Sequence, residues 1–214
     1  AAPSFGAYNA PGKFRFVDID GDGEINDDDR TEIGSPHPDF VYGISLNLSY
    51  KNLGLAVFGN GSSGNDIFNY VRYFADFNSF QGNRSVRALR DAWQPSNPSA
   101  PRSQWIAANP DATSPIMDAN DQTSSRVTTY LIEDGSYFRI RNIQLTYTFG
   151  DVINNALGID SGNIYLQGQN LFTFTNYSGL NPEVNEGSDL TLGYDGGYMP
   201  VAKTITVGLN LNLF

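Results

Sequence analysis

The chain has 214 residues, among them 14 Phe, 12 Tyr and 22 Gly, and this composition is typical of a protein with many strands and turns. The absence of cysteine excludes disulfides and Cys-ligated zinc, and a net charge of −10 without a basic patch argues against a nucleic-acid partner. No stretch approaches the ~20 apolar residues of a membrane helix, but a barrel of short, alternating strands remains open.

The first distinctive segment along the chain is strongly acidic. Residues 18–32 contain eight carboxylates against one arginine, Arg30, and so contribute −7 of the net charge of −10. Mutual repulsion of this density calls for a bound cation or an unfolded loop.

Within this segment, residues 18–29 fit the twelve-residue calcium-binding loop, with Gly23 at position 6 where the loop turns sharply. The predicted ligands occupy positions 1, 3, 5, 7, 9 and 12 and are Asp18, Asp20, Asp22, Glu24 (through its backbone carbonyl), Asn26 (through water) and Asp29. Position 12 is Asp instead of the longer Glu, and residues 14–17 look extended. We therefore expect a structural Ca²⁺ clip and not a sensor; a solvated acidic turn would also account for the segment.

Alternating side chains predict a β-hairpin after the acidic loop. In residues 40–50 every even position from Tyr42 to Tyr50 is apolar, and the odd positions between them are small or polar. Lys51-Asn52 is then a tight turn, and residues 53–58 are the second strand. A third, aromatic strand is predicted at 67–74.

Residues 76–125 differ in character from the rest. Five of the 11 prolines fall here, and only residues 85–93 look helical. A structureless segment of this length is unusual in a compact soluble domain, but long loops are ordinary on the outer face of an outer-membrane barrel. We therefore expect a long extracellular loop.

Strands are predicted again in the last part of the chain, separated by a loop at 176–202 that is rich in Gly and Tyr. The pattern in the second of these strands changes phase near Arg141-Asn142, where a β-bulge would keep the apolar residues on one side. The predicted strands are 126–133, 137–149, 163–175 and 205–213.

The alternation by itself leans toward a soluble sandwich with its apolar face inward. Strand lengths of about 10–13 residues exceed the ~5–6 usual in soluble sheets, and the long loop at 76–125 lies on one side only. These two features favour an all-β fold: an antiparallel transmembrane β-barrel segment with long extracellular loops.

Several stretches, in order along the chain, resemble the SusC/RagA family of TonB-dependent outer-membrane transporters. The most specific is QNLFTFTNYSGLNPEV at 169–184; IEDGSYFRIRNI at 132–143 and DAWQPSNP at 91–98 are further matches, with 16–43 and 198–213 at either end. The resemblance implies the closing strands of a plugged barrel of about 22 strands, more than the six to eight counted here. Residues 1–214 are thus expected to be the C-terminal part of the barrel, without the plug domain or the TonB-contact segment, which would lie N-terminal to this chain.

The resemblance also implies a function: import of glycan or peptide fragments across the outer membrane of a Gram-negative bacterium. The implied partners are a SusD-like surface lipoprotein, TonB through the missing N-terminal part, the remainder of the same barrel and outer-membrane lipid. Aromatic residues on loops are the candidates for substrate contact: Trp93, Trp105, Tyr177, Tyr194 and Tyr198.

Enzymatic activity is not expected. Glu133 and Asp134 could in principle perform acid–base chemistry, but a polar turn before a strand explains them, and His37, the single histidine, lies between two prolines without a partner signature. Two hypotheses besides transport stay open. One is a secreted, soluble, Ca²⁺-dependent β-rich binding module; the second is a SusC-like subunit of an outer-membrane complex that no longer transports.

Overall fold

The computed structural model describes residues 10–77, 84–118, 123–184 and 189–213. The chain forms two compact units. We call them the loop unit (Ala1–Gly34 with Phe68–Ile132) and the sheet unit (Ser35–Ile67 with Glu133–Phe214). No helix within the described residues is both long and apolar enough to cross a membrane.

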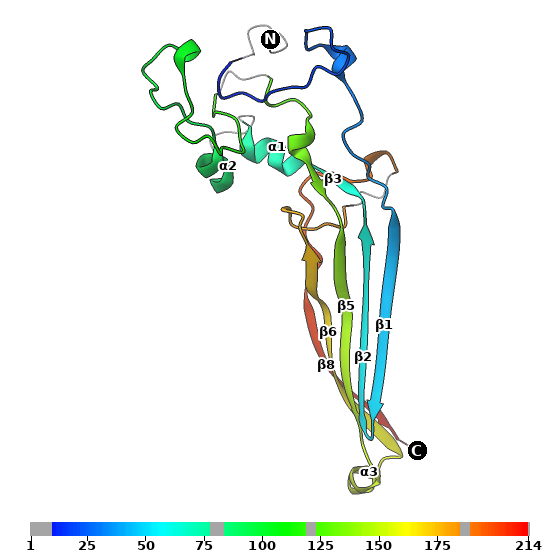
Figure 1. Ribbon diagram of the computed structural model, residues 1–214. Coiled ribbons are helices and arrows are strands. Elements are labelled where there is room, and N and C mark those ends of the chain that lie inside the picture. Colours follow the sequence, from blue (N-terminus) through cyan, green and yellow to red (C-terminus); the bar gives the residue numbers. More distant parts are fainter. Residues whose placement is uncertain (1–9, 78–83, 119–122, 185–188, 214) are drawn as a thin grey trace. The chain divides into compact units, whose positions relative to one another are not determined.

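Five long antiparallel strands dominate the sheet unit, in the order β1-β2-β5-β6-β8 (Figure 1). The sheet is open in this chain, with β1 and β8 at its edges. The strands are β1 (Phe40–Tyr50), β2 (Leu53–Ser63), β5 (Tyr137–Thr148), β6 (Ser161–Thr175) and β8 (Thr204–Asn212). The all-β antiparallel prediction is confirmed, and each long strand lies within a few residues of its predicted position, although β2 runs five residues further.

The two ends of this sheet are connected differently (Figure 1). At one end, here the turn end, Lys51 adopts a positive φ of 53° in the β1–β2 turn, and the short helix α3 (Asp151–Leu157) joins β5 to β6. At the other end, the loop end, the connections are long: residues 64–136 and 176–203. The sequence analysis did not predict α3, although Gly158 ends it as a left-handed C-cap with φ 67°.

A small second sheet lies at the loop end, with strand order β4-β3-β7. Its strands are β4 (Ile132–Asp134), β3 (Asp66–Asn69) and β7 (Tyr194–Asp195). Ile67, Tyr177 and Val184 form a buried apolar cluster next to it. The core of the sheet unit is therefore at the loop end and not along the long strands.

Two predicted strands are wrong. The segment 67–74 enters β3 but then turns into helix α1 (Tyr70–Asp76), because the Asn69 side chain accepts a hydrogen bond from the Arg72 amide (2.9 Å) and caps a helix start. The segment 126–133 is extended only from Ile132 onward and contains the 3₁₀ turn η4 (Thr129–Leu131). In both cases, the apolar pattern was too short to separate strand from helix.

The long 76–125 segment is loop with little regular structure. It contains α2 (Val86–Asp91), which confirms the predicted helix and is capped by the Ser85 hydroxyl accepting from the Ala88 amide (2.9 Å), and the 3₁₀ turn η3 (Arg102–Gln104). Isolated bridges join Ala92 to Ser114 and Pro95 to Ala107. Its predicted extracellular position stays a prediction.

The loop unit has its own core, built from aromatic rings around one carboxylate. Phe14 and Phe77 contact the Tyr130 ring, with centroids 5.0 and 5.6 Å away. The Asp76 side chain is 1 % exposed and accepts hydrogen bonds from the Tyr130 hydroxyl (2.7 Å) and from Arg87. The buried charge is thus paired, as a stable interior requires.

Candidate functional site

The five long strands place their apolar side chains on one face. Leu46 lies opposite Val57, which lies opposite Ile143. The pattern continues to the far edge, because Leu145 pairs with Leu166 and Leu166 with Val207. Aliphatic side chains between 43 % and 72 % exposed cover this apolar face: Ile44, Leu46, Leu48, Leu53, Leu145, Ile164, Leu166, Ile205, Val207, Leu209 and Leu211.

A β-bulge keeps this face continuous. Asn142 pairs with Phe58 and Ile140 with Gly59, so that Arg141 is the extra residue. The pairing of β5 with β6 shifts at the same place. The extra residue restores the phase, because a one-residue slip would otherwise turn the following side chains to the other face. The predicted bulge is confirmed.

Aromatic rings border the apolar face at the loop end. The Tyr42 and Phe138 rings are nearly parallel (3°) with centroids 5.9 Å apart, and Phe138 is 6.4 Å from Phe174. Glycines in β2 make room for them. A Cβ atom at Gly59 would lie 2.6 Å from Cζ of Phe138, and one at Gly61 would lie 2.9 Å from Cζ of Tyr42. The rings therefore lie flat over the glycine backbone.

A second aromatic border lies at the turn end. Tyr50 and Tyr147 both pair with Leu53 from either side, and Phe149 lies 6.2 Å from Tyr147 between centroids. The apolar face is thus aliphatic in the middle and aromatic at both ends.

The opposite face, called the polar face here, carries mostly small and polar side chains, with Val41, Phe58 and Tyr165 among them. The Gln167 amide donates to Asn142 (2.5 Å), and the Asn210 amide donates to Asn163 (3.0 Å). The only charged residues in the five strands are Arg139 and Arg141, both near the loop end. The hydrogen-bonding groups of the sheet therefore concentrate on the face that lacks the aliphatic side chains.

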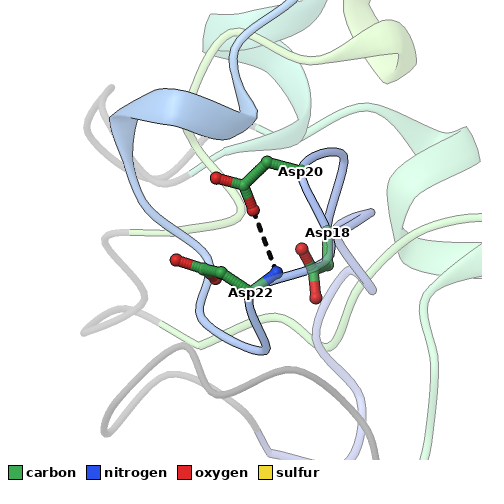
Figure 2. A group of neighbouring side chains, drawn as sticks. All are labelled: Asp18, Asp20 and Asp22. Carbon is green, nitrogen blue, oxygen red and sulfur yellow. Dashed lines mark hydrogen bonds between the residues drawn. The ribbon is translucent and has the colours of Figure 1, made fainter.

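The predicted calcium ligands are partly brought together (Figure 2). Asp18, Asp20 and Asp22 each offer one carboxylate oxygen, and these oxygens lie within 4.8 Å of one another. Gly21 and Gly23, with φ of 78° and 89°, turn the backbone so that their amides donate to Asp18 (2.7 and 2.9 Å). Glu24 and Asp29 are not members of this three-carboxylate group.

The last positions of the loop close it on itself. Asp29 accepts from the amides of Ile19 (2.7 Å) and Asn26 (2.8 Å), and Asn26 accepts from the Asp28 amide (2.7 Å). These bonds tie position 12 to position 2. The three grouped carboxylates supply hard oxygen donors of the kind that Ca²⁺ takes.

The surroundings shift the pKa values of two carboxyl groups in this loop in opposite directions. The amides of Asn26 and Ile19 donate to Asp29 and lower its pKa. The Asp22 amide lowers the pKa of Asp20, but desolvation and the neighbouring carboxylates of Asp22, Asp29 and Asp18 outweigh it and raise this pKa. Negative charges crowded around one carboxylate, as they are around Asp20, are the electrostatic condition that a divalent cation relieves.

Trp93 and Trp105 meet in the loop unit. Their ring centroids lie 6.2 Å apart, and both rings are half-buried. The Trp105 indole donates to the Ala100 carbonyl (2.8 Å), and Arg102 lies 5.4 Å from its ring while bonding Asp118 (2.8 Å). Contacts within the loop unit therefore already cover part of both indole rings.

The three predicted tyrosines lie in the sheet unit. Tyr177 is 5 % exposed and donates to the buried carboxylate of Asp195. Burial and then this hydrogen bond raise the pKa of Tyr177. Its ring is therefore covered in this conformation. Tyr194 belongs to β7 and is half-buried, and Tyr198 is 37 % exposed.

The residues weighed for acid–base chemistry hold backbone in place. Glu133 accepts from the amide and hydroxyl of Ser178 (2.9 and 2.8 Å), and Asp134 accepts from the Ser136 amide (2.8 Å). The His37 amide donates to Ser35 (3.3 Å). The two carboxylates therefore stabilise a loop and a turn through hydrogen bonds.

A charged cluster on the polar face was not predicted from the sequence. Arg139 and Arg141 both bond the carboxylate of Glu183, and the Tyr137 hydroxyl donates to it (2.7 Å). Arg139 also donates to Asn181 (2.7 Å). Two arginines spaced by two in β5, and an acidic residue in the connection that follows β6, were the available signal.

An open antiparallel sheet with one aliphatic face and one polar face defines the class: this is a segment of a large β-barrel. A scan against protein-family models finds no match. The chain is 34 % identical over 94 % of its length to TonB-dependent receptor P3 of Formosa agariphila, covering 19 % of that protein. It is 30 % identical to TonB-dependent receptor SusC of Bacteroides thetaiotaomicron over 92 % of its length, covering 17 % of that protein. A structure of the RagAB peptide transporter superposes with a TM-score of 0.69 and 26 % identity, over 94 % of this chain and 20 % of the other.

The chain therefore belongs to the SusC/RagA-like TonB-dependent receptors and forms one segment of such a protein. It spans about a fifth of the length of the curated relatives that it matches. These relatives are named as receptors, and none of the names describes an enzyme.

Proposed function

We propose that this chain is part of an outer-membrane β-barrel that imports nutrient fragments. The observation that carries the proposal is the single apolar face, which is exposed across all five strands and contains no charged residue. In water such a face would be a large aggregation-prone patch. Against lipid tails it is the expected outer surface of a barrel, with the polar face lining the lumen.

The height of the apolar face supports contact with a membrane. Tyr42 and Tyr50 stand at its two aromatic borders on β1. Eight residue steps at ~3.4 Å give about 27 Å along the strand. At a tilt of ~40° this is about 21 Å across the membrane, close to the ~25 Å apolar band of outer-membrane barrels. The aromatic borders would then meet the lipid head groups.

The unequal connections give the orientation. In bacterial barrels the periplasmic turns are short and the extracellular loops are long. The turn end with Lys51 and α3 would face the periplasm, and the loop end would face the outside. The residue 64–136 connection would then be extracellular.

The names of the similar proteins support a cargo class. RagAB is described as a peptide importer, and SusC is named as a TonB-dependent receptor. We propose import of peptide or glycan fragments, energised through TonB by the part of the receptor that precedes this segment. A SusD-like surface lipoprotein would cap the loop end. Four of the predicted aromatic residues have partly exposed side chains that cargo could meet: Trp93, Trp105, Tyr194 and Tyr198.

Uptake by cells tests this function. In a bacterium carrying the whole receptor, its gene is deleted, and uptake of labelled oligopeptides and oligosaccharides is measured. We expect loss of one cargo class, restored by the whole receptor and not by a version without its TonB-contact segment. Unchanged uptake with the receptor in the outer membrane would favour a non-transporting subunit. Recovery of the receptor as a soluble protein would favour a Ca²⁺-dependent binding module.

We further propose that residues 18–29 bind Ca²⁺ as a structural clip. The three grouped carboxylates of Asp18, Asp20 and Asp22 support it. Bound Ca²⁺ would neutralise their repulsion and fix the loop. Asp20→Asn should weaken Ca²⁺ binding to the whole receptor and raise hydrogen exchange in 18–29 at a given Ca²⁺ concentration. Asp28→Asn is the matched control, because Asp28 lies in the same loop but outside the ligand positions. Equal Ca²⁺ affinity of the two variants would refute the clip.

A further inference from the structure

The connection from β6 to β8 begins with a segment, residues 177–184, that folds back onto the polar face of the sheet. Its C-terminal part is held by Arg139, which is 4 % exposed. Each outer nitrogen of this guanidinium has a partner: Nη2 donates to Asn181 (2.7 Å) and Nη1 to Glu183. Nε donates to Thr173 of β6 (2.9 Å), which fixes the guanidinium on the sheet itself.

Glu183 is held from a second direction. Both of its carboxylate oxygens are used: Oε2 by Arg139, and Oε1 by Arg141 and by the Tyr137 hydroxyl (2.7 Å). Arg141 in turn donates to Asn60 of β2 (2.6 Å). One loop carboxylate is thus clamped by side chains of β5 whose positions are fixed by β2 and β6.

The N-terminal part of the segment is anchored independently. Tyr177 lies in the apolar cluster with Ile67 and Val184, and its hydroxyl donates to buried Asp195. Ser178 donates to Glu133 through both its amide (2.9 Å) and its hydroxyl (2.8 Å). The segment is therefore attached at both ends.

Between the two anchors stands an exposed apolar side chain. Leu180 is 71 % exposed, although Tyr177 before it and Asn181 after it are buried. A single exposed leucine is ordinary on a protein surface, and what distinguishes Leu180 is that the backbone on both sides of it is anchored. A residue whose backbone is already anchored loses little further backbone entropy when something binds its side chain.

We propose that residues 177–184 form a fixed lip over the polar face at the loop end, with Leu180 as its cargo-contacting, size-selecting residue. This rests on the proposed function, in which the polar face lines the lumen. The lip would narrow the outer entrance permanently, since releasing it leaves Arg139 buried and unpaired. Leu180 would contact the apolar part of a passing peptide or sugar.

The first arm of the test measures the lip without any transport. Hydrogen exchange is followed in the purified whole receptor. We expect slow exchange in 177–184, at least tenfold faster exchange in Glu183→Ala, and a smaller increase in Glu183→Gln. Asp151→Ala, which removes an exposed carboxylate at the turn end, should leave the lip unchanged. Fast exchange in the unaltered receptor, or no response to Glu183→Ala, would overturn the fixed lip.

The second arm measures selection. Uptake of cargo of increasing length is compared between the whole receptor, Leu180→Trp and Met199→Trp. Met199 is 89 % exposed in the same connection and serves as the matched control. We expect Leu180→Trp to lower uptake of long cargo several-fold relative to short cargo, and Met199→Trp to change neither. Equal length profiles in all three receptors would overturn the role of Leu180. Absence of uptake in the unaltered receptor would count against the proposed function, while the exchange arm would still decide whether the lip is fixed.

Discussion

The two units of this chain use apolar side chains in opposite ways. In the loop unit, Phe14, Phe77 and Tyr130 pack against one another around a buried carboxylate. In the sheet unit, side chains such as Ile205 and Val207 stand 72 % and 69 % exposed on long regular strands. The loop unit has its own interior, whereas the long strands leave their aliphatic side chains outside any core of this chain, and the proposed barrel would place them against lipid. Apolar side chains therefore lie in an interior in the loop unit and on an exposed face in the sheet unit.

The two units also differ in where their charged side chains lie. The loop unit contains Asp76, nearly without solvent contact but bonded to Arg72, Arg87, Ser85 and Tyr130. The long strands contain only two charged residues, both on the polar face. A buried charge with several partners suits an interior formed by the protein itself, while a lipid-facing surface tolerates none.

The largest expected effect tests the interior of the loop unit. Asp76→Ala leaves Arg72 and Arg87 without their common carboxylate, and we expect α1 and α2 to lose about 3 kcal/mol or more of local stability. Hydrogen exchange in the two helices of the whole receptor measures it. Asp91→Asn is the control, because its ion pair with Arg90 is largely exposed and should contribute less than about 1 kcal/mol. Equal effects of the two variants would contradict a self-contained core.

A second change tests the two faces of the sheet. Leu46 and Asn47 are neighbours in β1 on opposite faces, in the middle of the apolar height. Leu46→Arg should lower the free energy of unfolding of the membrane-inserted receptor by about 2–4 kcal/mol, because it puts a charge in the hydrocarbon. Asn47→Arg should cost far less, since it would face the lumen. Urea unfolding from lipid measures both, and a larger loss for Asn47→Arg would reverse the assignment of the faces.

The smallest effect concerns the anchor of the lip at high pH. Burial and the bond to Asp195 raise the pKa of Tyr177, so the phenol stays protonated in the folded state after it ionises in the unfolded chain. Its contribution is complete below pH ~10 and falls as the pH rises further, by about 1 kcal/mol between pH 10 and 11.

Tyr177→Phe removes this contribution. At neutral pH the variant should be about 1–3 kcal/mol less stable, because Asp195 loses a buried donor. The difference from the unaltered receptor should shrink between pH 10 and 11 in urea titrations. Tyr198→Phe, at a 37 % exposed position, should show no such convergence. A constant difference across this range would mean that Tyr177 ionises normally.

The long strands were predictable because their side chains alternate with a two-residue period, and the bulge at Arg141 was visible as the change of phase that interrupts this period in β5. Helix α1 was not, because Tyr70–Asp76 is rich in aromatic residues that also suit strands, and a single capping side chain decides its conformation. The 126–133 segment failed because Val127, at 65 % exposed, and Tyr130 do not share one face of a strand.

The candidate sites also differ in how far the sequence could predict them. The calcium loop is contiguous in sequence, so its spacing alone predicted that Asp18, Asp20 and Asp22 would approach one another, although Asp29, predicted with them, is not in the group. The lip is assembled from β5 and the β6–β8 connection, more than 40 residues apart, as the Arg139–Glu183 bond shows. No local sequence pattern reveals a pairing between residues so far apart. Tyr177 was taken for a surface aromatic because no sequence signal announced its buried partner Asp195.

The two unpaired edges of the five-stranded sheet have a practical consequence. β1 and β8 each have one side without a neighbouring strand in this chain. Bare strand edges are templates for pairing with other chains, and an exposed aliphatic surface strengthens this tendency. Produced alone in water, this polypeptide should therefore form edge-to-edge ribbons and inclusion bodies. Detergent would cover its apolar face but would leave the edges open, so co-expression of complementary strands is the better route to a soluble sample.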